Sequence, residues 1–374
     1  MTASAPTWSS DAVLRRLRGT GEGLTGSAGP GAAADRAMGR ALTGFLDRIA
    51  GRGSGPAVDG IVALPFLVHG THTGDPAPAE PAAVAHVLWW VSARYLDDLS
   101  DAGPRPSAAA GPDSTDQDLL AVIGIACHLA AELLDEACRD DPERALRLRQ
   151  ELSRSWHRGI AGQLADLTAT AATATADEVM AGYLGKTGAP YAMAAAMGAM
   201  LAGCDEARVD AWRDFGARFG VLRQLVNDQR DISSGRYEDL RNGTATFMVV
   251  QYLKSLSEPE RVVAEKLLVG CADSAAAREE FAAQLTEPSR LRAFAAVVRP
   301  LIDGLHASID EAGGVGEYVA GLHGLVDQTV NLYPEFLLGV RDRGVNGVVD
   351  ESAVDESAVD EDGSPTPPEG IVAR

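Results

Sequence analysis

Two clusters of oxygen-bearing side chains follow apolar segments of the chain. In each cluster the oxygen ligands stand at positions i, i+1 and i+4, which share one face of a helix. They are Asp97, Asp98 and Asp101 in YLDDLSD, and Asn227, Asp228 and Asp231 in QLVNDQRD. Hard oxygen ligands suit Mg²⁺, which retains waters and bridges to phosphate oxygens. The two clusters therefore predict metal-assisted binding of a phosphorylated ligand between two helix ends.

The position of the first cluster indicates that a cation balances it. Asp97 and Asp98 follow apolar turns that contain Trp89 and Trp90, so they stand at the C-terminal end of a helix. Aspartate favours helix N-termini, because the helix dipole is positive there and negative at the C-terminus. The alternative, a plain acidic helix end that enters a loop, is weakened by this orientation and by the absence of interspersed lysines.

Helices must position both clusters. Strand-like alternation is nearly absent, and apolar residues recur at three-to-four spacing from about residue 32 to about residue 340. With 374 residues, 46% of them hydrophobic, the chain can bury a large core. We predict an all-α fold with one large helical domain over residues 31–345, a flexible segment over residues 1–30, and a disordered acidic tail over residues 346–374.

Charge and cysteine usage exclude several classes of protein. A net charge of −20 disfavours nucleic acid or an anionic membrane as partner. The four cysteines form no CxxC pair, so neither a structural zinc site nor a disulfide framework is expected, and a reduced, cytoplasmic location fits. The most apolar run, residues 189–204, is too short for stable membrane insertion and predicts a buried helix.

Other residues near these segments are candidates for anion binding. Lys186 lies between Gly185 and Gly188, which we expect to break a helix and so to offer backbone N–H groups and a cation together. A plain interhelical turn is the alternative. Gln224, three residues before Asn227, could orient a ligand carboxylate. Two arginines of the same helix, Arg223 and Arg230, either bind a diphosphate or pair with neighbouring acids.

Five motifs in a fixed order carry a family resemblance. They are DDLSD (97–101), GQLADL (162–167), GKTG (185–188), FGVLRQLVNDQRD (219–231) and DLRNGTATFMVV (239–250). In this order, over roughly residues 57–256, the chain resembles the trans-isoprenyl diphosphate synthase, or polyprenyl synthetase, family.

The resemblance implies a fold, an activity and a set of site residues. It implies a bundle of the isoprenoid synthase type around a deep apolar pocket, a homodimer, and the ionisation of an allylic prenyl diphosphate by Mg²⁺, with three ions. It implies that the metal ligands and the groups that orient them are Asp97, Asp98, Asp101, Asn227, Asp228, Asp231 and Gln163. Lys186 and Thr187 would contact the diphosphate.

The chain departs from the elongating members of this family. Their basic GKRxRP segment binds isopentenyl diphosphate, whereas the aligned VDGIVALPFLVHG keeps Pro65 but has apolar residues and glycine in place of the cations. Thr244 likewise replaces a lysine. Since a pocket without cations would desolvate a diphosphate without compensation, we expect poor binding of isopentenyl diphosphate. Asn227 is similar to the Asn that opens the terpene synthase NSE motif, although Asp231 and Gly235 depart from that motif.

Small residues before the first cluster suggest a long substrate. Ser92 and Ala93 precede Asp97 by one turn, and Trp89 lies about two turns away, roughly 12 Å along the helix. In the family, bulky residues at the first positions stop short chains, so we expect a C20 substrate with Trp89 as the pocket floor. Aromatic residues are candidates to stabilise a carbocation, although core packing is their commoner role. The candidates are Trp89, Trp90, Tyr95, Trp156, Tyr191, Phe215 and Phe219.

Three hypotheses of function follow. The main one is a Mg²⁺-dependent class I terpene synthase that converts a linear allylic diphosphate, geranylgeranyl diphosphate, to a cyclised or rearranged terpene plus diphosphate. The first alternative is a prenyltransferase, which either elongates isoprenyl chains or alkylates an indole or peptide. The second is a catalytically silent regulatory subunit of a prenyl synthase.

Overall fold

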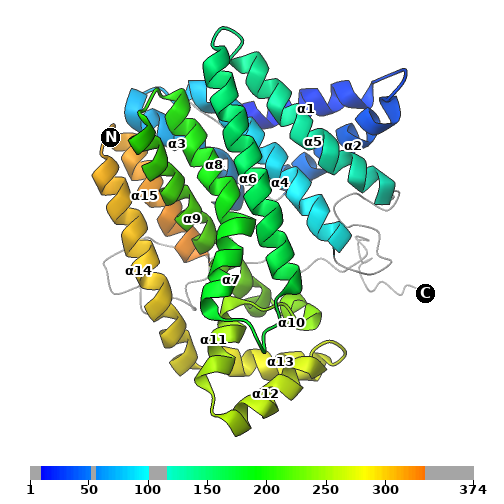
Figure 1. Cartoon of the computed structure of the whole chain (residues 1–374), viewed down its shortest axis with the longest axis vertical. Coiled ribbons are helices and arrows are strands. Elements are labelled where there is room, and N and C mark those ends of the chain that lie inside the picture. The colour runs from blue at the N-terminus through cyan, green and yellow to red at the C-terminus, as the bar shows by residue number, and fades with distance from the viewer. Residues whose placement is uncertain (1–9, 52–55, 101–115, 333–374) are drawn as a thin grey trace, which may run out of the picture.

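Helices joined by short loops make up the part of the chain that the structure describes, residues 10–51, 56–100 and 116–332 of this computed structural model (Figure 1). In chain order the helices are α1 (Ser10–Thr25), α2 (Ala32–Gly51), α3 (Pro56–Thr73), η1 (Ala77–Ala79), α4 (Glu80–Ser100), α5 (Asp116–Ala137), α6 (Pro142–Thr168), α7 (Ala176–Tyr183), η2 (Leu184–Gly188), α8 (Ala189–Leu201), α9 (Glu206–Ser233), α10 (Glu238–Asn242), α11 (Phe247–Ser255), α12 (Glu258–Gly270), α13 (Ala275–Leu285), α14 (Pro288–Ala312) and α15 (Gly316–Asn331). Within these ranges no strand occurs, which confirms the predicted all-α fold.

α8 lies at the centre of the bundle because its sequence has no polar face. Every residue from Ala189 to Met200 is buried, and the helix packs against α3, α4, α6 and α9. The buried helix predicted from the apolar run is therefore confirmed. None of the helices over the described ranges combines the length and the apolar character that a membrane span needs.

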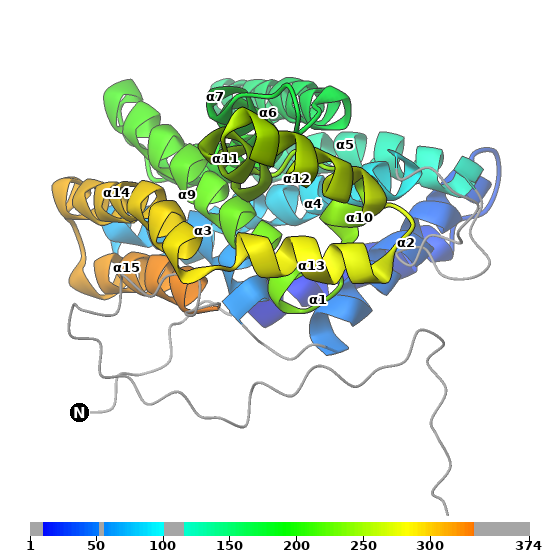
Figure 2. The same cartoon turned by 90° about the horizontal axis from the view of Figure 1, so that it is seen from below.

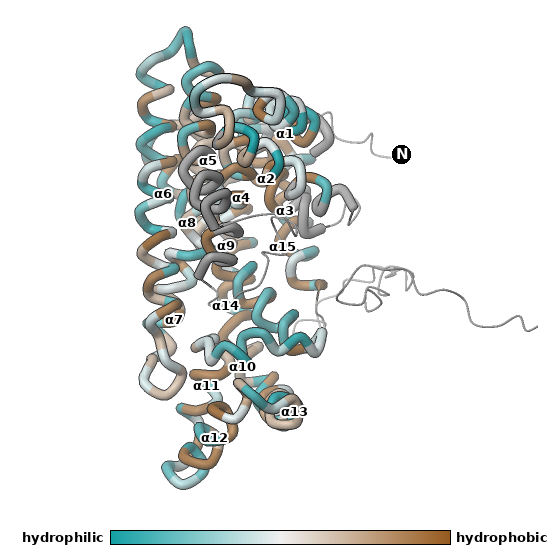
Figure 3. The backbone as a smooth tube through the Cα atoms, turned by 90° about the vertical axis from the view of Figure 1, so that its right-hand side faces the viewer, coloured by the Kyte–Doolittle hydropathy of each residue, from teal (hydrophilic) through white to brown (hydrophobic). Residues whose placement is uncertain are grey.

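The remaining helices surround this centre in a definite arrangement. α14 and α15 lie side by side along one flank, against α9 and α3, whereas α1, α2 and α5 cover the opposite flank (Figures 1 and 2). α10 to α13 form a smaller group of helices beyond the lower end of the core, and hydrophilic residues are frequent along α6 at the edge of the bundle (Figure 3). α9 leads directly into α10 at this lower end.

Part of the segment predicted to be flexible is a helix. Residues 10–25 form α1, which packs on α2 and α3, and the side chains of Val13 and Leu17 are fully buried. The two apolar residues stand four positions apart, on one face of the helix. Their spacing is the sequence signal for a helix, although the Gly-rich composition of the segment led to the prediction of a flexible segment. The predicted acidic tail lies outside the described residues.

A proline and a histidine complete each other's hydrogen bonding between α3 and α4. Pro65 lies inside α3 and has no N–H, so the carbonyl of Ile61, four residues earlier, loses its helical partner. Nδ1 of His86 donates to that carbonyl over 2.7 Å. Because Nδ1 carries the proton, Nε2 is free to accept from the indole N–H of Trp90 at 3.0 Å. His86 is therefore held as a neutral ring, and its complete burial lowers its pKa from 6.5 to about 4.

This histidine makes stability depend on pH. The unfolded chain takes up a proton at His86 near pH 6.5 and the folded chain only near pH 4, so the contribution is complete above pH 6.5 and declines as the pH falls towards 4. At about 1.4 kcal/mol per pH unit, the free energy of unfolding falls by about 3 kcal/mol over this interval. We expect His86→Gln to lose less stability than the native chain between pH 7 and pH 4.5, as measured by urea unfolding. His157→Gln, at an exposed position, is the control, and an unchanged acid slope in His86→Gln would contradict the prediction.

Candidate active site

A π-helical turn, η2, carries Lys186 and Thr187 between α7 and α8. The sequence analysis expected Gly185 and Gly188 to break a helix here, which is wrong, because the helical backbone continues from α7 through η2 into α8. Gly185 instead permits close packing against Gly162 of α6. A Cβ on Gly162 would lie 2.2 Å from the backbone N of Lys186, and one on Gly185 would lie 2.7 Å from the Cα of Gly162. The glycines thus let η2 press against α6.

Close packing of η2 on α6 brings Lys186 to a carboxylate. Its Nζ lies 2.8 Å from Oδ2 of Asp166, and both side chains are largely shielded from solvent, with 25% and 19% exposed. Asp166 belongs to the GQLADL motif but is not among the predicted site residues. Gln163, which is among them, lies one turn earlier on α6 and is 8% exposed.

Hydrogen bonds join Thr187 to the second acidic cluster. The Thr187 hydroxyl donates to Oε1 of Gln224 at 2.5 Å, and Nε2 of Gln224 donates to Oδ1 of Asp228 at 2.8 Å. Oδ2 of Asp228 accepts from the hydroxyl of Tyr183, which itself accepts from the backbone N–H of Phe247 at 2.9 Å. The network fixes Asp228 from α7, η2, α9 and α11. Gln224 thus contacts a carboxylate of the second cluster, while its role in orienting a metal ligand stays a prediction. The network also contains Tyr183, which the sequence analysis missed.

Carboxylates are crowded around this network. Burial is the main cause that raises the pKa of Asp228 well above its usual value, and the charge of Asp239 adds to it. Burial and the charge of Asp231 raise the pKa of Asp239 to about 7, although Lys186 opposes this shift. Asp166 raises the pKa of both. Such an excess of negative charge is relieved by a bound cation, so these residues fit the predicted Mg²⁺.

The second cluster divides into residues with different surroundings. Asp231 is 2% exposed and caps α10, since its two carboxylate oxygens accept from the N–H groups of Glu238 and Asp239, each at 3.0 Å. Tyr237, just before that helix, has a left-handed backbone with φ of 50°. Asn227 is exposed. Over the described ranges, no group of three or more acidic, histidine or cysteine residues could hold a metal ion. The predicted set of metal ligands therefore depends on the first cluster.

The first cluster is only partly within the described residues. Asp97 and Asp98 lie in the last turn of α4, which confirms that the cluster follows a helical segment, but their side chains are outside the described part. Asp101 lies outside the described residues altogether. The predicted meeting of the two clusters across a pocket thus remains a prediction.

Aromatic residues of the proposed pocket pack in the core. The ring of Trp89 lies 5.2 Å from that of Trp156 and 5.5 Å from that of Trp90, and Trp89 leaves no room for a Cβ on Gly159 of α6. A second run of contacts joins Tyr191, Phe219 and Phe215. Ser92 is fully buried and Ala93 is half-buried on the same helix as Trp89. The side chain of Tyr95 is outside the described part.

The two predicted arginines lie in different surroundings. Arg223 hydrogen-bonds the buried hydroxyl of Tyr191, and its charge also lowers the pKa of His86, so it lies in the aromatic core. The sequence analysis considered two partners for Arg223, a diphosphate and a neighbouring acid. The contact with Tyr191 is a third one, which it did not consider. Arg230 is half-buried on α9.

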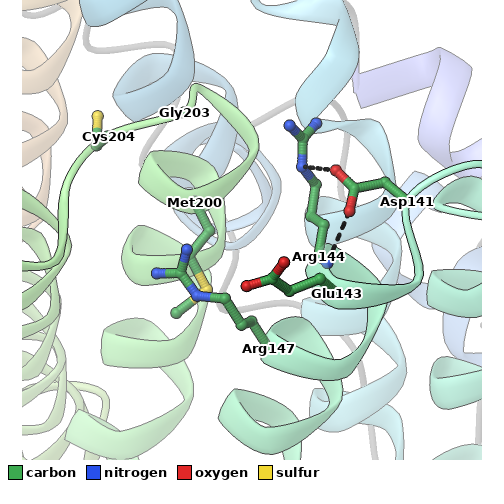
Figure 4. Close-up of a pocket in the computed structure, with 7 residues that line it drawn as sticks. All are labelled: Asp141, Glu143, Arg144, Arg147, Met200, Gly203 and Cys204. Atoms are coloured by element: carbon green, nitrogen blue, oxygen red, sulfur yellow. Dashed lines mark hydrogen bonds and ion pairs between the residues drawn. The ribbon is translucent and has the colours of Figure 1, made fainter.

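The cavities found among the described residues lie at the other end of α6. One, of about 180 Å³, is lined by Asp141, Arg144, Arg147, Met200 and Cys204, together with Glu143 and Gly203 (Figure 4). Its neighbour, of about 460 Å³, shares Asp141 and Arg144. Arg147 is 19 residues from Asp166 on one helix, or about 30 Å at 1.5 Å per residue. Neither cavity is the predicted apolar pocket, which remains a prediction.

These features define an all-α protein that gathers a lysine, a π-helical turn and several carboxylates at one end of its bundle. The polyprenyl synthetase family model matches residues 121–284. Geranylgeranyl diphosphate synthase of Sulfolobus acidocaldarius is 28% identical over 102 residues, which span 25% of this chain and 30% of that enzyme. Over residues 121–284 the chain thus resembles the polyprenyl synthetase family, and it spans less than half the length of the curated synthases that it matches.

Solved structures of this family share the fold. The polyprenyl synthetase of Streptomyces coelicolor A3(2) superposes with a TM-score of 0.68 at 22% identity, over 86% of this chain and 99% of that one. Geranylgeranyl pyrophosphate synthase of Corynebacterium glutamicum, in complex with calcium and isoprenyl diphosphate, gives a TM-score of 0.66 at 20% identity, over 86% and 95% of the two chains.

Proposed function

We propose that the chain is a Mg²⁺-dependent prenyltransferase that ionises an allylic prenyl diphosphate. The bond between the allylic carbon and the diphosphate oxygen breaks, diphosphate departs with the electron pair, and the double bond of an acceptor attacks the cation and then loses a proton. The family match and the synthases among its relatives favour this alternative over the terpene synthase of the main sequence-based hypothesis.

One observation carries the proposal. Lys186 and Thr187 are adjacent on η2, and each is held by a partner, Asp166 and Gln224, beside the carboxylate of Asp228. A lysine cation and a hydroxyl beside carboxylates suit a diphosphate that Mg²⁺ bridges to the protein. Asp97, Asp98, Asp101, Asn227 and Asp231 would supply further ligands, and the number of ions is three in this proposal.

The terpene synthase remains the second candidate, because of α3. Ile61, Val62 and Leu64 stand where the resemblance places the lysine and arginines that bind isopentenyl diphosphate. Val62 and Leu64 are fully buried in the apolar core, and α3 contains no lysine or arginine that could take over the role of the missing cations. An enzyme that lacks this second anion site would quench the cation with the substrate's own double bonds.

Product analysis separates these candidates. We would incubate the purified chain with Mg²⁺ and C10, C15 or C20 allylic diphosphates, with and without isopentenyl diphosphate, and identify products by mass. Longer diphosphates that require isopentenyl diphosphate would support chain elongation. Hydrocarbons or alcohols formed without it would support the terpene synthase. Absence of turnover with all substrates would contradict both and favour a silent regulatory subunit.

We also propose that the chain forms a homodimer through α6. Ile160, Leu164 and Leu167 lie at i, i+4 and i+7 on one face of α6 and are 46%, 57% and 51% exposed. Leu164→Glu is expected to shift the sedimentation coefficient from dimer to monomer, because it places a charge in an apolar contact. Val269→Glu, on α12 with 77% exposure, is the matched control. An unchanged dimer in Leu164→Glu would contradict this interface.

A further inference from the structure

Two histidine rings meet edge to edge where α14 lies beside α15. The rings of His306 and His323 have centroids 5.0 Å apart and planes inclined by 14°, and their Nδ1 atoms lie only 2.7 Å apart. Both side chains are partly open to solvent, with 26% and 28% exposed. The two helices run side by side on the flank of the bundle (Figure 2), on elements that contribute nothing to the proposed active site.

Carboxylates determine the protonation of the two rings. Nε2 of His306 lies 3.2 Å from Oδ1 of Asp327, and Nε2 of His323 lies 3.1 Å from Oδ1 of Asp310. An ionised carboxylate only accepts hydrogen bonds, so Nε2 of His323, which is hydrogen-bonded to Asp310, carries a proton, and a neutral His323 keeps its lone pair on Nδ1. In the metal-free chain, an N–H group on Nδ1 of His306 can donate to this lone pair over the 2.7 Å between the two Nδ1 atoms. A metal ion that binds both Nδ1 atoms would replace that hydrogen atom.

We propose that His306 and His323 bind a divalent transition metal of the Cu²⁺, Ni²⁺ or Zn²⁺ type through both Nδ1 atoms. Neutral imidazole is a preferred ligand of these metals. A carboxylate on the far ring nitrogen is the arrangement that orients metal-binding histidines and increases their basicity, and here both rings have it. The two aspartates also give the group a charge of −2, which a divalent ion neutralises.

The geometry needs a small adjustment for a metal. At metal–nitrogen distances of about 2.0–2.1 Å, a shared ion holds two nitrogens about 2.9 Å apart at a right angle and about 3.4 Å apart at a tetrahedral angle. The two Nδ1 atoms must therefore separate by a few tenths of an ångström, and both rings must turn so that their lone pairs meet at the metal. Their partial exposure allows both movements, and waters complete the coordination. Arg218 of α9, which reaches α14, is held there by Ser308 at 2.9 Å and on its own helix by Asp214 at 2.7 Å.

Copper titration of the full chain tests this site. Excess Mg²⁺ is added to occupy carboxylate sites. The electron paramagnetic resonance spectrum of bound Cu²⁺ is then expected to show splitting by two imidazole nitrogens. His306→Gln and His323→Gln should each leave one nitrogen and weaken binding. Asp310→Asn with Asp327→Asn should keep both nitrogens but weaken binding by about 10- to 100-fold.

Controls make the result decisive. His157→Gln, on the exposed face of α6, should leave the copper signal unchanged. A native spectrum with fewer than two coordinated nitrogens, or a two-nitrogen signal that survives both histidine variants, overturns the proposal. The native spectrum decides even if a variant folds poorly, and none of these outcomes depends on prenyl diphosphate turnover.

Discussion

Asp228→Asn is expected to lower turnover of an allylic prenyl diphosphate by about 10²- to 10³-fold while the melting temperature stays level or rises. The carboxylate is 5% exposed, and burial raises its pKa, so its ionised form costs free energy in the folded state. A neutral amide of the same shape removes this cost. It also removes the negative charge that the proposed Mg²⁺ requires, so activity and stability should change in opposite directions.

The measurements are kcat and KM at increasing Mg²⁺ and a thermal melt at pH 8. Tyr183→Phe is the matched control, because it removes one hydrogen bond to Asp228 and leaves the charge. Turnover by Tyr183→Phe should fall about 3- to 10-fold, which corresponds to one hydrogen bond of about 0.5–1.5 kcal/mol. Higher Mg²⁺ should restore part of this turnover. Full turnover by Asp228→Asn at saturating Mg²⁺ would exclude the carboxylate from the proposed site.

Features that depend on local sequence were predictable. The apolar run from Ala189 has no polar face, so α8 could only be a buried helix. The helix that carries the second cluster begins at Glu206, because the Asp205 side chain accepts from the N–H of Arg208 at 2.8 Å and caps α9. The glycines around Lys186 were misread, since glycine serves a close approach between helices as readily as a break.

Features that depend on packing were not predictable. Tyr183 reaches Asp228 only because η2 continues α7 into α8 without a break. Asp239 joins the acidic group only because Asp231 anchors α10 beneath α9. Asp166 could have been found, because it is the polar residue of the GQLADL motif that accompanies the site residue Gln163. Its role required the distance to Lys186, which no spacing in the sequence contains.

Lys186→Ala is expected to raise the KM for a prenyl diphosphate by about 10²-fold, which corresponds to about 2.7 kcal/mol of lost electrostatic binding. Asp166 loses the cation 2.8 Å away, and Asp239, whose pKa Lys186 holds down, experiences more repulsion. The remaining carboxylates would then oppose an anionic substrate. Lys254→Ala, at an exposed position of α11, should leave the KM unchanged.

A double variant distinguishes two roles of this lysine. If Lys186 acts only by neutralising Asp166, then Lys186→Ala combined with Asp166→Ala removes both charges and should restore the KM. If Lys186 contacts the diphosphate, the double variant should remain as impaired as Lys186→Ala alone, because no cation replaces the lost contact. The proposed function requires the second result, and recovery in the double variant would place the diphosphate elsewhere than η2.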